Sequence, residues 1–489
     1  MRKQRPFHRI FLPCISAVLM AIGCVACDPQ IDTRPNAVLR FSCDTLRFDT
    51  VFTQTNSPTL QFKVYNPQKH AVNIEQIRLR DGEYFRLNVD GETNADNLQN
   101  ITLLGKDSLY VFIKTRIDEQ HTSSPVFTED EVCFLTNGNL QKVVLEAYGQ
   151  DVERLSKFAV LQDTVLGGDK PYLIYDYLVV DTACTLTLKE GTTFYMHDNA
   201  SLIVYGNLLA EGSLEQPIRI QGDRLDYLYT HVPYKVVSGK WNGVYLLQPE
   251  KESPCTHKFN NVEIISGKVG LYCSSADKNV APHISIDNSR IHNFSQYGVV
   301  LQNADAAICN TEISNCAQYC LYLAGGEYTL LHNTIASYYR NTNIGNIQPV
   351  QREDVAAVYL NNLSKDNRPT VCKMYNNIIT GIRKNNFVLA TPLPQRYAGE
   401  FAGNYIRNDS IHLDCFNNNV YAADKDTVFV CTFYSIDDFC YYDFHLDSIS
   451  PARGAALSTF SAALPYDREG NPRPAEGADI GCYQYVKKD

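Results

Sequence analysis

A short asparagine phrase recurs between residues 286 and 379 and constrains the fold more than any other stretch of this 489-residue chain. Each copy has an apolar residue, a variable residue, an asparagine and a small polar residue, with isoleucine close behind. The asparagines follow one another after 22, 23 and 43 residues, the last interval being close to two of the shorter ones: Asn288, Asn310, Asn333 and Asn376. A period in the low twenties built from short β-type segments indicates a stacked-coil solenoid.

The recurring asparagine is best explained as a structural corner residue. Its amide can bond to backbone groups and to the asparagine of the next turn, and asparagine also tolerates left-handed backbone angles. We therefore predict that Asn288, Asn310, Asn333 and Asn376 form one ladder. The alternative, in which these side chains are sugar ligands, is disfavoured.

Short apolar runs broken by single glycines extend the pattern back to residue 185. Glycine supplies the permissive backbone angles of a sharp corner between strands. A second apolar run follows each asparagine phrase, so we expect at least two strands per turn. The pattern lapses at 339–354, which we expect to leave the coil as a candidate lid or binding loop. Several runs of the coil carry tyrosine: 241–246, 269–272, 297–301, 319–323 and 358–361.

Two parts of this region resemble known families. The glycine-broken runs of 185–220 resemble the first turns of right-handed parallel β-helix proteins of the pectate-lyase-like class, which implies such a helix over 153–489. The chain end resembles the closing motif of secreted β-helix proteins described as choice-of-anchor Q, a motif specific for architecture and not for activity. Its matching residues are 450–452, Asp467, Gly470, Arg473, 479–481 and Tyr483, with departures at 453–454, Cys482 and Gln484.

The first 27 residues have the features of an export signal. Four basic residues precede an apolar core of 13 residues, which is short for a membrane span. The small residues that follow resemble the lipobox of bacterial lipoproteins, in which a cysteine is lipidated. Cys27 is the preferred attachment site and Cys24 the alternative, although Cys27 has Cys24 rather than leucine three residues upstream. Residues 28–36 then form a polar tether.

Residues 37–152 contain about eight short alternating strands separated by turn residues, which predicts an antiparallel sandwich. The stretch resembles immunoglobulin-like domains of the abnormal-spindle and Hydin type, with 62–66 and 147–149 as its most recognisable pieces. The resemblance implies a spacer or binding module. We expect this immunoglobulin-like sandwich to serve as a stalk for the β-helix in an all-β chain.

Charge and cysteine content exclude some function classes. Without the four basic residues of the leader, the net charge falls from −10 to −14, which argues against a nucleic-acid partner. Thirteen cysteines follow the leader, an odd number without C-x-x-C pairs, and we expect most to be small buried side chains. A disulfide such as Cys43–Cys133 is not deducible from sequence. Cys316 and Cys320 lack a second ligand pair, so we expect no metal site.

The best local candidate for catalysis is the loop that contains Asp223, Arg224 and Asp226, two acids and a base after an early strand. Asp287 with Arg290 is another. A lyase needs a base beside acids that hold calcium or neutralise a uronate, so Ca²⁺ is expected only if the protein is a lyase, and otherwise no cofactor. In each case a solvated surface charge or a loop salt bridge is the favoured explanation.

The whole chain resembles outer-membrane lipoproteins of Bacteroidota-type bacteria that carry a right-handed parallel β-helix. We expect a lipid-anchored, surface-exposed protein of the outer membrane. A non-enzymatic structural module that binds glycan or another protein is the preferred function, and a polysaccharide lyase or glycoside hydrolase is the alternative. Tyrosines aligned along one face of the coil would suit sugar stacking in either case, whereas three or more acids converging with a base would favour the enzyme.

Overall fold

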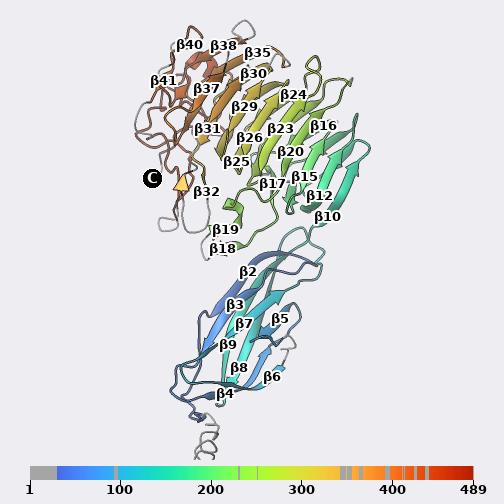
Figure 1. Cartoon of the computed structure of the whole chain (residues 1–489), viewed down its shortest axis with the longest axis vertical. Helices are drawn as coiled ribbons and strands as arrows, with labels where there is room; N and C mark the ends of the chain where they lie inside the picture. The colour runs from blue at the N-terminus through green and yellow to red at the C-terminus, as the bar shows by residue number, and fades with distance from the viewer. Residues whose placement is uncertain are drawn as a thin grey trace, which may run out of the picture. The chain divides into compact units, whose positions relative to one another are not determined.

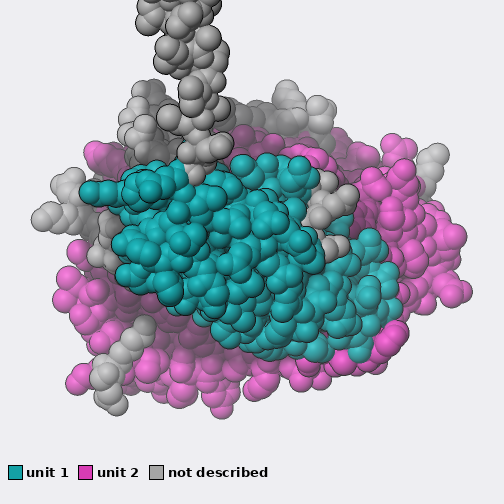
Figure 2. All heavy atoms as spheres, turned by 90° about the horizontal axis from the view of Figure 1, so that it is seen from below, with its two compact units in different colours: residues 1–120, 125–150 teal, residues 121–124, 151–489 magenta. Residues whose placement is uncertain are grey.

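The computed structural model describes residues 30–92, 97–229, 232–250, 252–341, 348–349, 355–362, 367–390, 397–409, 411, 413–422, 427–435 and 440–487. Residues 1–29, with the predicted signal, Cys24 and Cys27, lie outside the described residues. The chain divides into two compact units, residues 1–120 with 125–150 and residues 121–124 with 151–489, which have separate colours in Figure 2. The expected boundary after residue 152 lies close to this division.

Unit 1 consists of two sheets that share one apolar core. The sheets have the strand orders β1-β3-β7-β5 and β2-β9-β8-β4-β6, and their pairings are antiparallel except β2 with β9. The strands are β1 Arg40–Phe41, β2 Thr45–Phe52, β3 Leu60–Tyr65, β4 Val72–Leu79, β5 Phe85–Val89, β6 Asn97–Leu103, β7 Ser108–Thr115, β8 Val126–Thr136 and β9 Asn139–Gln150.

The core of unit 1 follows from alternation along its strands. In β7 every second residue is buried, so Leu109, Val111 and Ile113 point inward, as a half-buried strand requires. Strand β6 is an exception that the sequence did not predict. It is polar and mostly exposed at the edge of its sheet, so it lacks the alternating apolar signal.

Unit 2 is a stack of parallel β-coils, consistent with a β-helix. Figure 1 shows its strands side by side from β10 to β41. Strand β24 pairs with β27, β25 with β28 and β26 with β29, all in parallel, so these turns contribute three strands each. The paired strands form one sheet of 18 strands and another of 10.

The strands of the 18-stranded sheet are β10 Glu153–Val160, β12 Tyr172–Val180, β14 Thr193–Met196, β15 Ser201–Val204, β17 Ile218–Gly222, β20 Gly243–Gln248, β22 Val262–Ile265, β23 Val269–Ser275, β25 Arg290–Phe294, β26 Tyr297–Gln302, β28 Glu312–Cys316, β29 Leu321–Ala324, β31 Thr334–Ser337, β34 Val358–Asn361, β36 Ile378–Gly381, β37 Phe387–Ala390, β39 Tyr405–Ile406 and β41 Val420–Tyr421. Those of the 10-stranded sheet are β11 Thr164–Leu166, β13 Thr185–Leu188, β16 Asn207–Glu211, β21 Thr256–Asn260, β24 His283–Asp287, β27 Asp305–Cys309, β30 Gly326–Leu331, β35 Thr370–Tyr375, β38 Tyr397–Ala402 and β40 Phe416–Asn417.

Short elements complete unit 2 outside these two sheets. Three two-stranded sheets pair β18 with β19, β32 with β33 and β42 with β43, and a 3-10 turn and one described α-helix lie in loops. Their bounds are β18 Tyr227–Tyr229, β19 Val232–Pro233, η1 Tyr234–Val236, β32 Arg340–Asn341, β33 Gln348–Pro349, β42 Tyr434–Ser435, β43 Cys440–Tyr441 and α2 Ser458–Ser461.

The interior of the coil is filled by apolar side chains stacked from turn to turn. One inward column joins Phe259, Ile286, Ile308, Leu330 and Met374 in strand register, and each is at most 1% exposed. Burial of each such side chain contributes roughly 1.5–3 kcal/mol, and repetition along the axis is what stabilises the stack.

One interval of the repeat was interpreted wrongly from the sequence. The spacing predicts nearly two turns for the 43-residue step before Asn376, but β30 pairs directly with β35, so the step is a single turn. The extra residues lie in the connections from β31 to β34 and from β34 to β35. The lapse expected at 339–354 falls in the first of these connections, where residues 342–347 and 350–354 lie outside the described residues.

The end of the chain packs against the side of the coil. In this C-terminal segment, residues 450–485, the Tyr466 carbonyl accepts a hydrogen bond from Asn310 at 2.9 Å, and the Gly481 amide donates to the Asn376 carbonyl at 2.9 Å. Arg468 donates to the Ser289 carbonyl at 3.2 Å. The segment therefore bridges successive turns of the stack.

The motif residues at the end of the chain hold the C-terminal segment in shape. Asp467 accepts hydrogen bonds from the backbone amides of Glu469, Asn471 and Gln484, and Asp479 accepts from those of Gly454 and Tyr485. Arg473 donates to the Gly481 carbonyl at 2.9 Å. These contacts are internal to the segment, which indicates that the motif has an architectural role.

Candidate functional site

A row of tyrosines runs along the outside of the coil and is the candidate functional site. Tyr245 pairs in register with Tyr272, and Tyr322 with Tyr359, on strands β20, β23, β29 and β34. Val300 on β26 occupies the position between the two pairs. All four tyrosines are partly exposed, while their neighbours along each strand are buried. We call this row the tyrosine face.

The rings of the tyrosine face contact one another. The Tyr245 and Tyr272 ring centroids are 6.1 Å apart, and those of Tyr322 and Tyr359 are 5.7 Å apart with the ring planes inclined by 1°. Tyr319 adds a ring 4.8 Å from Tyr359, and Tyr297 stacks on Tyr319 at 6.1 Å. Contact between neighbouring rings restricts their motion. The rings form an aromatic strip in two parts, Tyr245 with Tyr272 and then the other four rings, because Val300 occupies the turn between them.

A column of polar side chains runs beside the aromatic strip. Ser274, Gln302 and Asn361 form an adjoining column on β23, β26 and β34, linked in register through Ala324. The Asn361 amide donates to the Tyr322 hydroxyl at 2.6 Å, which fixes the position of that ring. An aromatic strip beside neutral hydrogen-bonding groups suits a ligand with an apolar face and several hydroxyl groups.

Sequence reasoning found the tyrosine-bearing runs but did not assign them as a site. The informative signal is a tyrosine between two buried apolar residues in successive runs, as in Val244-Tyr245-Leu246 and Leu321-Tyr322-Leu323. Alternation within each run places the middle residue outward. The step from one run to the next places the outward residues in one column.

The predicted catalytic loop holds its charged groups in local pairs. The Arg224 guanidinium binds Asp226 through two hydrogen bonds of 2.6 Å, and the same hydrogen bonding raises the pKa of Arg224. Asp223 pairs instead with the His197 ring at 2.6 Å. The two acids therefore have different partners and do not converge on a common point with the arginine.

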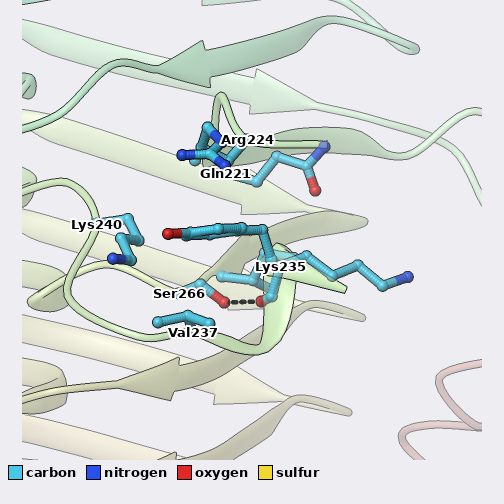
Figure 3. A pocket seen from close by; sticks show the side chains of 9 residues that line it. Gln221, Arg224, Lys235, Val237, Lys240 and Ser266 are labelled. Carbon is cyan, nitrogen blue, oxygen red and sulfur yellow. Dashed lines mark hydrogen bonds between the residues drawn. The ribbon is translucent and has the colours of Figure 1, made fainter. Parts of the chain in front are cut away.

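A small pocket adjoins this loop, lined by Arg224, Tyr234, Lys240 and neighbouring residues (Figure 3). The Tyr234 ring lies 4.0 Å from the Arg224 guanidinium and 5.1 Å from the Lys240 ammonium. The Lys235 carbonyl accepts a hydrogen bond from Ser266, while the Lys235 side chain extends away from Lys240. The cavity volume is about 10 Å³, room for roughly one water molecule, so a sugar does not fit.

The second predicted pair is also separated. Arg290 contacts Glu312 at 3.1 Å rather than Asp287, whose pKa is raised by burial. Glu312 is 2% exposed and accepts further hydrogen bonds from Ser314 at 2.5 Å and from the Tyr483 hydroxyl. This buried cluster joins the coil to the C-terminal segment.

Competing effects set the charge of that cluster. Burial by itself would raise the pKa of Glu312, but Arg290, the His292 hydrogen bond and Arg468 together hold the pKa well below its usual range. Burial lowers the pKa of His292 to about 4. Glu312 is therefore charged and His292 neutral at pH 7, an arrangement suited to holding structure.

The four predicted ladder asparagines lie in two neighbouring columns rather than one. Asn288, Asn310 and Asn376 occupy the first column, where each has a left-handed φ of 48–55° and Asn310 donates to the Asn288 amide oxygen at 3.2 Å. His332 takes the corresponding position in the intervening turn, with φ 53°. Asn333 belongs to the next column.

This second column forms a continuous buried ladder. The side-chain oxygen of Asn333 accepts a hydrogen bond from the Thr311 backbone amide at 2.9 Å. The side-chain oxygen of Asn377 likewise accepts one from the Asn333 backbone amide at 2.9 Å. Asn377 in turn donates through its backbone and side-chain amides to Asn404, each at 2.9 Å. Asn333, Asn377 and Asn404 are 0% exposed, so the ladder has no surface for a ligand.

Most described cysteines are buried thiols. Cys273, Cys316, Cys320, Cys372 and Cys482 are free and 0% exposed, and burial raises the pKa of Cys482 to about 12. Cys43 and Cys133, considered as a disulfide from the sequence, are both free thiols, whereas Cys431 is disulfide-bonded. Apart from Cys431, these side chains act as small apolar groups.

The described part of the chain holds no group of three or more His, Cys, Asp and Glu side chains arranged for a metal ion. Within the same residues, no helix combines the length and apolar character of a membrane span.

Comparisons with known proteins add no family assignment. No protein-family model matches the chain, and no curated protein matches it. The sequence resemblances to the β-helix, closing-motif and lipoprotein families thus have no support from these comparisons.

Solved structures give only weak similarities. The chain is similar to a family 123 glycoside hydrolase from Clostridium perfringens, at 6% identity and TM-score 0.17, over 23% of this chain and 25% of that one. It is also similar to the Vibrio cholerae VesB protease, at 15% identity and TM-score 0.17, over 23% and 32%. A Pseudomonas fluorescens alkylpurine DNA glycosylase, AlkC, gives 10% identity and TM-score 0.15, over 23% and 30%. The chain spans only a quarter to a third of these proteins, and the similarities carry no argument about fold or function.

Proposed function

We propose that the chain is a non-enzymatic binding protein whose coil holds an extended, neutral polysaccharide along the tyrosine face. The in-register rings of Tyr245, Tyr272, Tyr322 and Tyr359 support this proposal. A polymer lying along the axis meets successive turns, and the C–H face of a sugar ring stacks on a tyrosine while its hydroxyl groups remain available for hydrogen bonds.

The uncharged side chains beside the rings favour a neutral polysaccharide. The flanking column of Ser274, Gln302 and Asn361 offers hydroxyl and amide groups, which pair with sugar hydroxyls without a charge. An acidic polysaccharide would instead call for arginine or lysine beside the rings.

Within the described residues, nothing favours the alternative of a lyase or hydrolase. A glycoside hydrolase needs two carboxyl groups placed about a sugar bond, and a lyase needs a free base near its acids. Asp226 is bound by Arg224 and Asp223 by His197, so both acids of the loop predicted as the catalytic site already have local hydrogen-bond partners.

The remaining assignments are proposals from the sequence. The coil is a right-handed parallel β-helix closed by a choice-of-anchor Q-type end, and unit 1 is an immunoglobulin-like stalk. Cys27 carries the lipid that holds the protein at the surface of the outer membrane, with Cys24 as the alternative attachment site. Buried acyl chains contribute roughly 0.8 kcal/mol for each CH₂ group, enough for stable anchoring by more than one chain.

The anchor is tested by labelling cells that express the chain with a clickable palmitate analogue. We expect the wild-type chain to be labelled and Cys27→Ala to lose the label, because the acyl groups are attached to that cysteine. Cys24→Ala serves as the matched control and should retain the label. Labelling that persists in Cys27→Ala, or that is lost only in Cys24→Ala, would contradict the assignment of Cys27.

The glycan-binding proposal is tested by affinity electrophoresis of the full chain, in detergent, through gels that contain mixed-linkage β-glucan, xyloglucan, galactomannan or polygalacturonate. We expect at least one neutral polymer to retard the protein. Tyr322→Ala and Tyr359→Ala should each weaken that binding about tenfold, since loss of a buried aromatic contact costs on the order of 1–2 kcal/mol.

Tyr466→Ala is the matched control, because Tyr466 is 58% exposed on the C-terminal segment and lies outside the tyrosine face. It should bind as the wild type does. Absence of retardation by every neutral polymer would overturn the proposal, and so would unchanged binding in both tyrosine-face variants.

A further inference from the structure

Unit 1 contains a second candidate site, built where two of its turns interlock. The backbone amide of Lys106 donates to the Asn66 and Gln68 carbonyls, both at 3.1 Å, and the Asn66 amide donates to the Asp107 carbonyl at 3.0 Å. At Gly105 an added Cβ would lie 2.1 Å from the Lys69 carbonyl oxygen, so only glycine allows the turns to approach this closely. The β3–β4 and β6–β7 turns thus form one fixed wall.

A buried side chain reinforces this wall. Asn66 is 1% exposed, and its amide nitrogen donates to the carbonyls of His70, Leu103 and Leu104 at 2.9–3.1 Å. Lys106 closes the same junction by donating from its ammonium to the Pro67 carbonyl at 2.5 Å. Donors on both turns are therefore already satisfied, and the wall keeps its shape without a ligand.

The wall borders a pocket of about 370 Å³, within the range of roughly 300–1,000 Å³ typical of sites for small ligands. Arg40 on β1 and Tyr65 on β3 are direct partners in an antiparallel pair, so their side chains leave the sheet on the same face. Tyr65 is 38% exposed, which leaves ring surface available beside the arginine. The remaining lining residues are Phe41, Asn66, Pro67, Lys106 and Asp107.

The charge of the pocket selects an anion. Two cationic side chains, Arg40 and Lys106, line it against a single carboxylate, Asp107. Among the residues that the structure describes, Arg40 makes no ion pair, although the chain as a whole carries a net charge of −10. An arginine fork binds a carboxylate through two parallel hydrogen bonds, and the neighbouring tyrosine ring offers a flat apolar surface.

We propose that this pocket binds an acidic sugar residue, with the ring of the sugar on Tyr65 and its anionic group on Arg40. The site is separate from the tyrosine face, in a different unit, and takes a ligand of opposite electrostatic character. A carboxylate and a sulfate ester would satisfy the same arginine, so both sources of the anion belong to the test. Recognition by the two units together would then require a polymer, or a mixture, that contains both neutral and acidic sugars.

Isothermal titration of the full chain in detergent tests the site with four probes: digalacturonate, glucuronate, N-acetylglucosamine 6-sulfate and the neutral disaccharide cellobiose. We expect binding of at least one acidic probe, at least tenfold tighter than any binding of cellobiose at this site. Arg40→Gln and Tyr65→Ala should each weaken it at least tenfold. Binding of the uronates or of the sulfated sugar decides which anion the pocket prefers.

Lys114→Gln is the matched control, since Lys114 is an exposed cation on β7 of the same unit and does not line the pocket. It should leave the affinity unchanged. The inference is overturned if no acidic probe binds, if cellobiose competes equally, or if Arg40→Gln binds as the wild type. Retardation by neutral polymers should persist in Arg40→Gln and weaken in Tyr322→Ala, which separates the test of this pocket from the test of the tyrosine face.

Discussion

Replacing Glu312 with alanine is expected to lower the free energy of unfolding of unit 2 by about 3 kcal/mol, because the change leaves the partly buried Arg290 without its partner. The Tyr483 hydroxyl loses its acceptor in the same change, so one of the contacts between the C-terminal segment and the coil is lost. The chain has 1 tryptophan, Trp241, which is 0% exposed in unit 2. Urea unfolding followed by tryptophan fluorescence therefore measures this unit alone.

Two further variants sharpen the measurement. Glu312→Gln keeps the shape and one acceptor oxygen of the side chain but loses the charge. Its free energy of unfolding should therefore lie between those of the wild type and the alanine variant. Asp409→Ala removes an acid of the same unit from an exposed pair with Lys384 and should leave the unfolding midpoint unchanged. A Glu312→Ala protein as stable as the wild type would show that the cluster does not hold the segment.

Asn377→Ala in the buried ladder is expected to lower the free energy of unfolding of unit 2 by about 3 kcal/mol. The Asn377 amide oxygen accepts from both the backbone and the side-chain nitrogen of Asn333, each at 2.9 Å, and alanine leaves both donors buried without an acceptor. Each buried donor without a partner costs about 1–3 kcal/mol. The same urea titration with Trp241 as probe gives the change in free energy.

The first asparagine column supplies the control for this prediction. Asn288 is only partly buried and has a φ of 50°, which glycine adopts without strain. Asn288→Gly removes one side-chain amide of that column while it keeps the backbone angle, so we expect a loss of about 1 kcal/mol. If Asn288→Gly destabilises unit 2 as much as Asn377→Ala does, the buried ladder has no special importance.

The repeat predicted the architecture because each turn reuses the same physical solution. Alternation within a run identifies the inward residues, and a 22-residue step, as from Asp287 to its partner Cys309, is set by strand register. The prediction failed where residue identity and strand register give different alignments. Matching asparagines aligns Asn333 with Asn310, but register aligns His332 there, because a histidine occupies that corner.

The candidate sites were harder to predict because they depend on contacts between distant segments. Asp223 and Arg224 are adjacent in the sequence, yet His197 takes the aspartate and Asp226 takes the arginine. Arg40 meets Tyr65 only after β1 pairs with β3. A local motif shows which groups are available, whereas the pairing of segments decides which of them remain free for a ligand.

The buried thiols have a consequence for the order of events in biogenesis. Once the coil is folded, Cys316, Cys320 and Cys372 are 0% exposed, and an oxidant in solution has no access to their sulfur atoms. Any oxidation of these thiols therefore takes place before the coil has folded. If the chain is exported as proposed, each turn must close before an oxidase reaches its cysteine, so that assembly of the stack and disulfide formation become competing reactions.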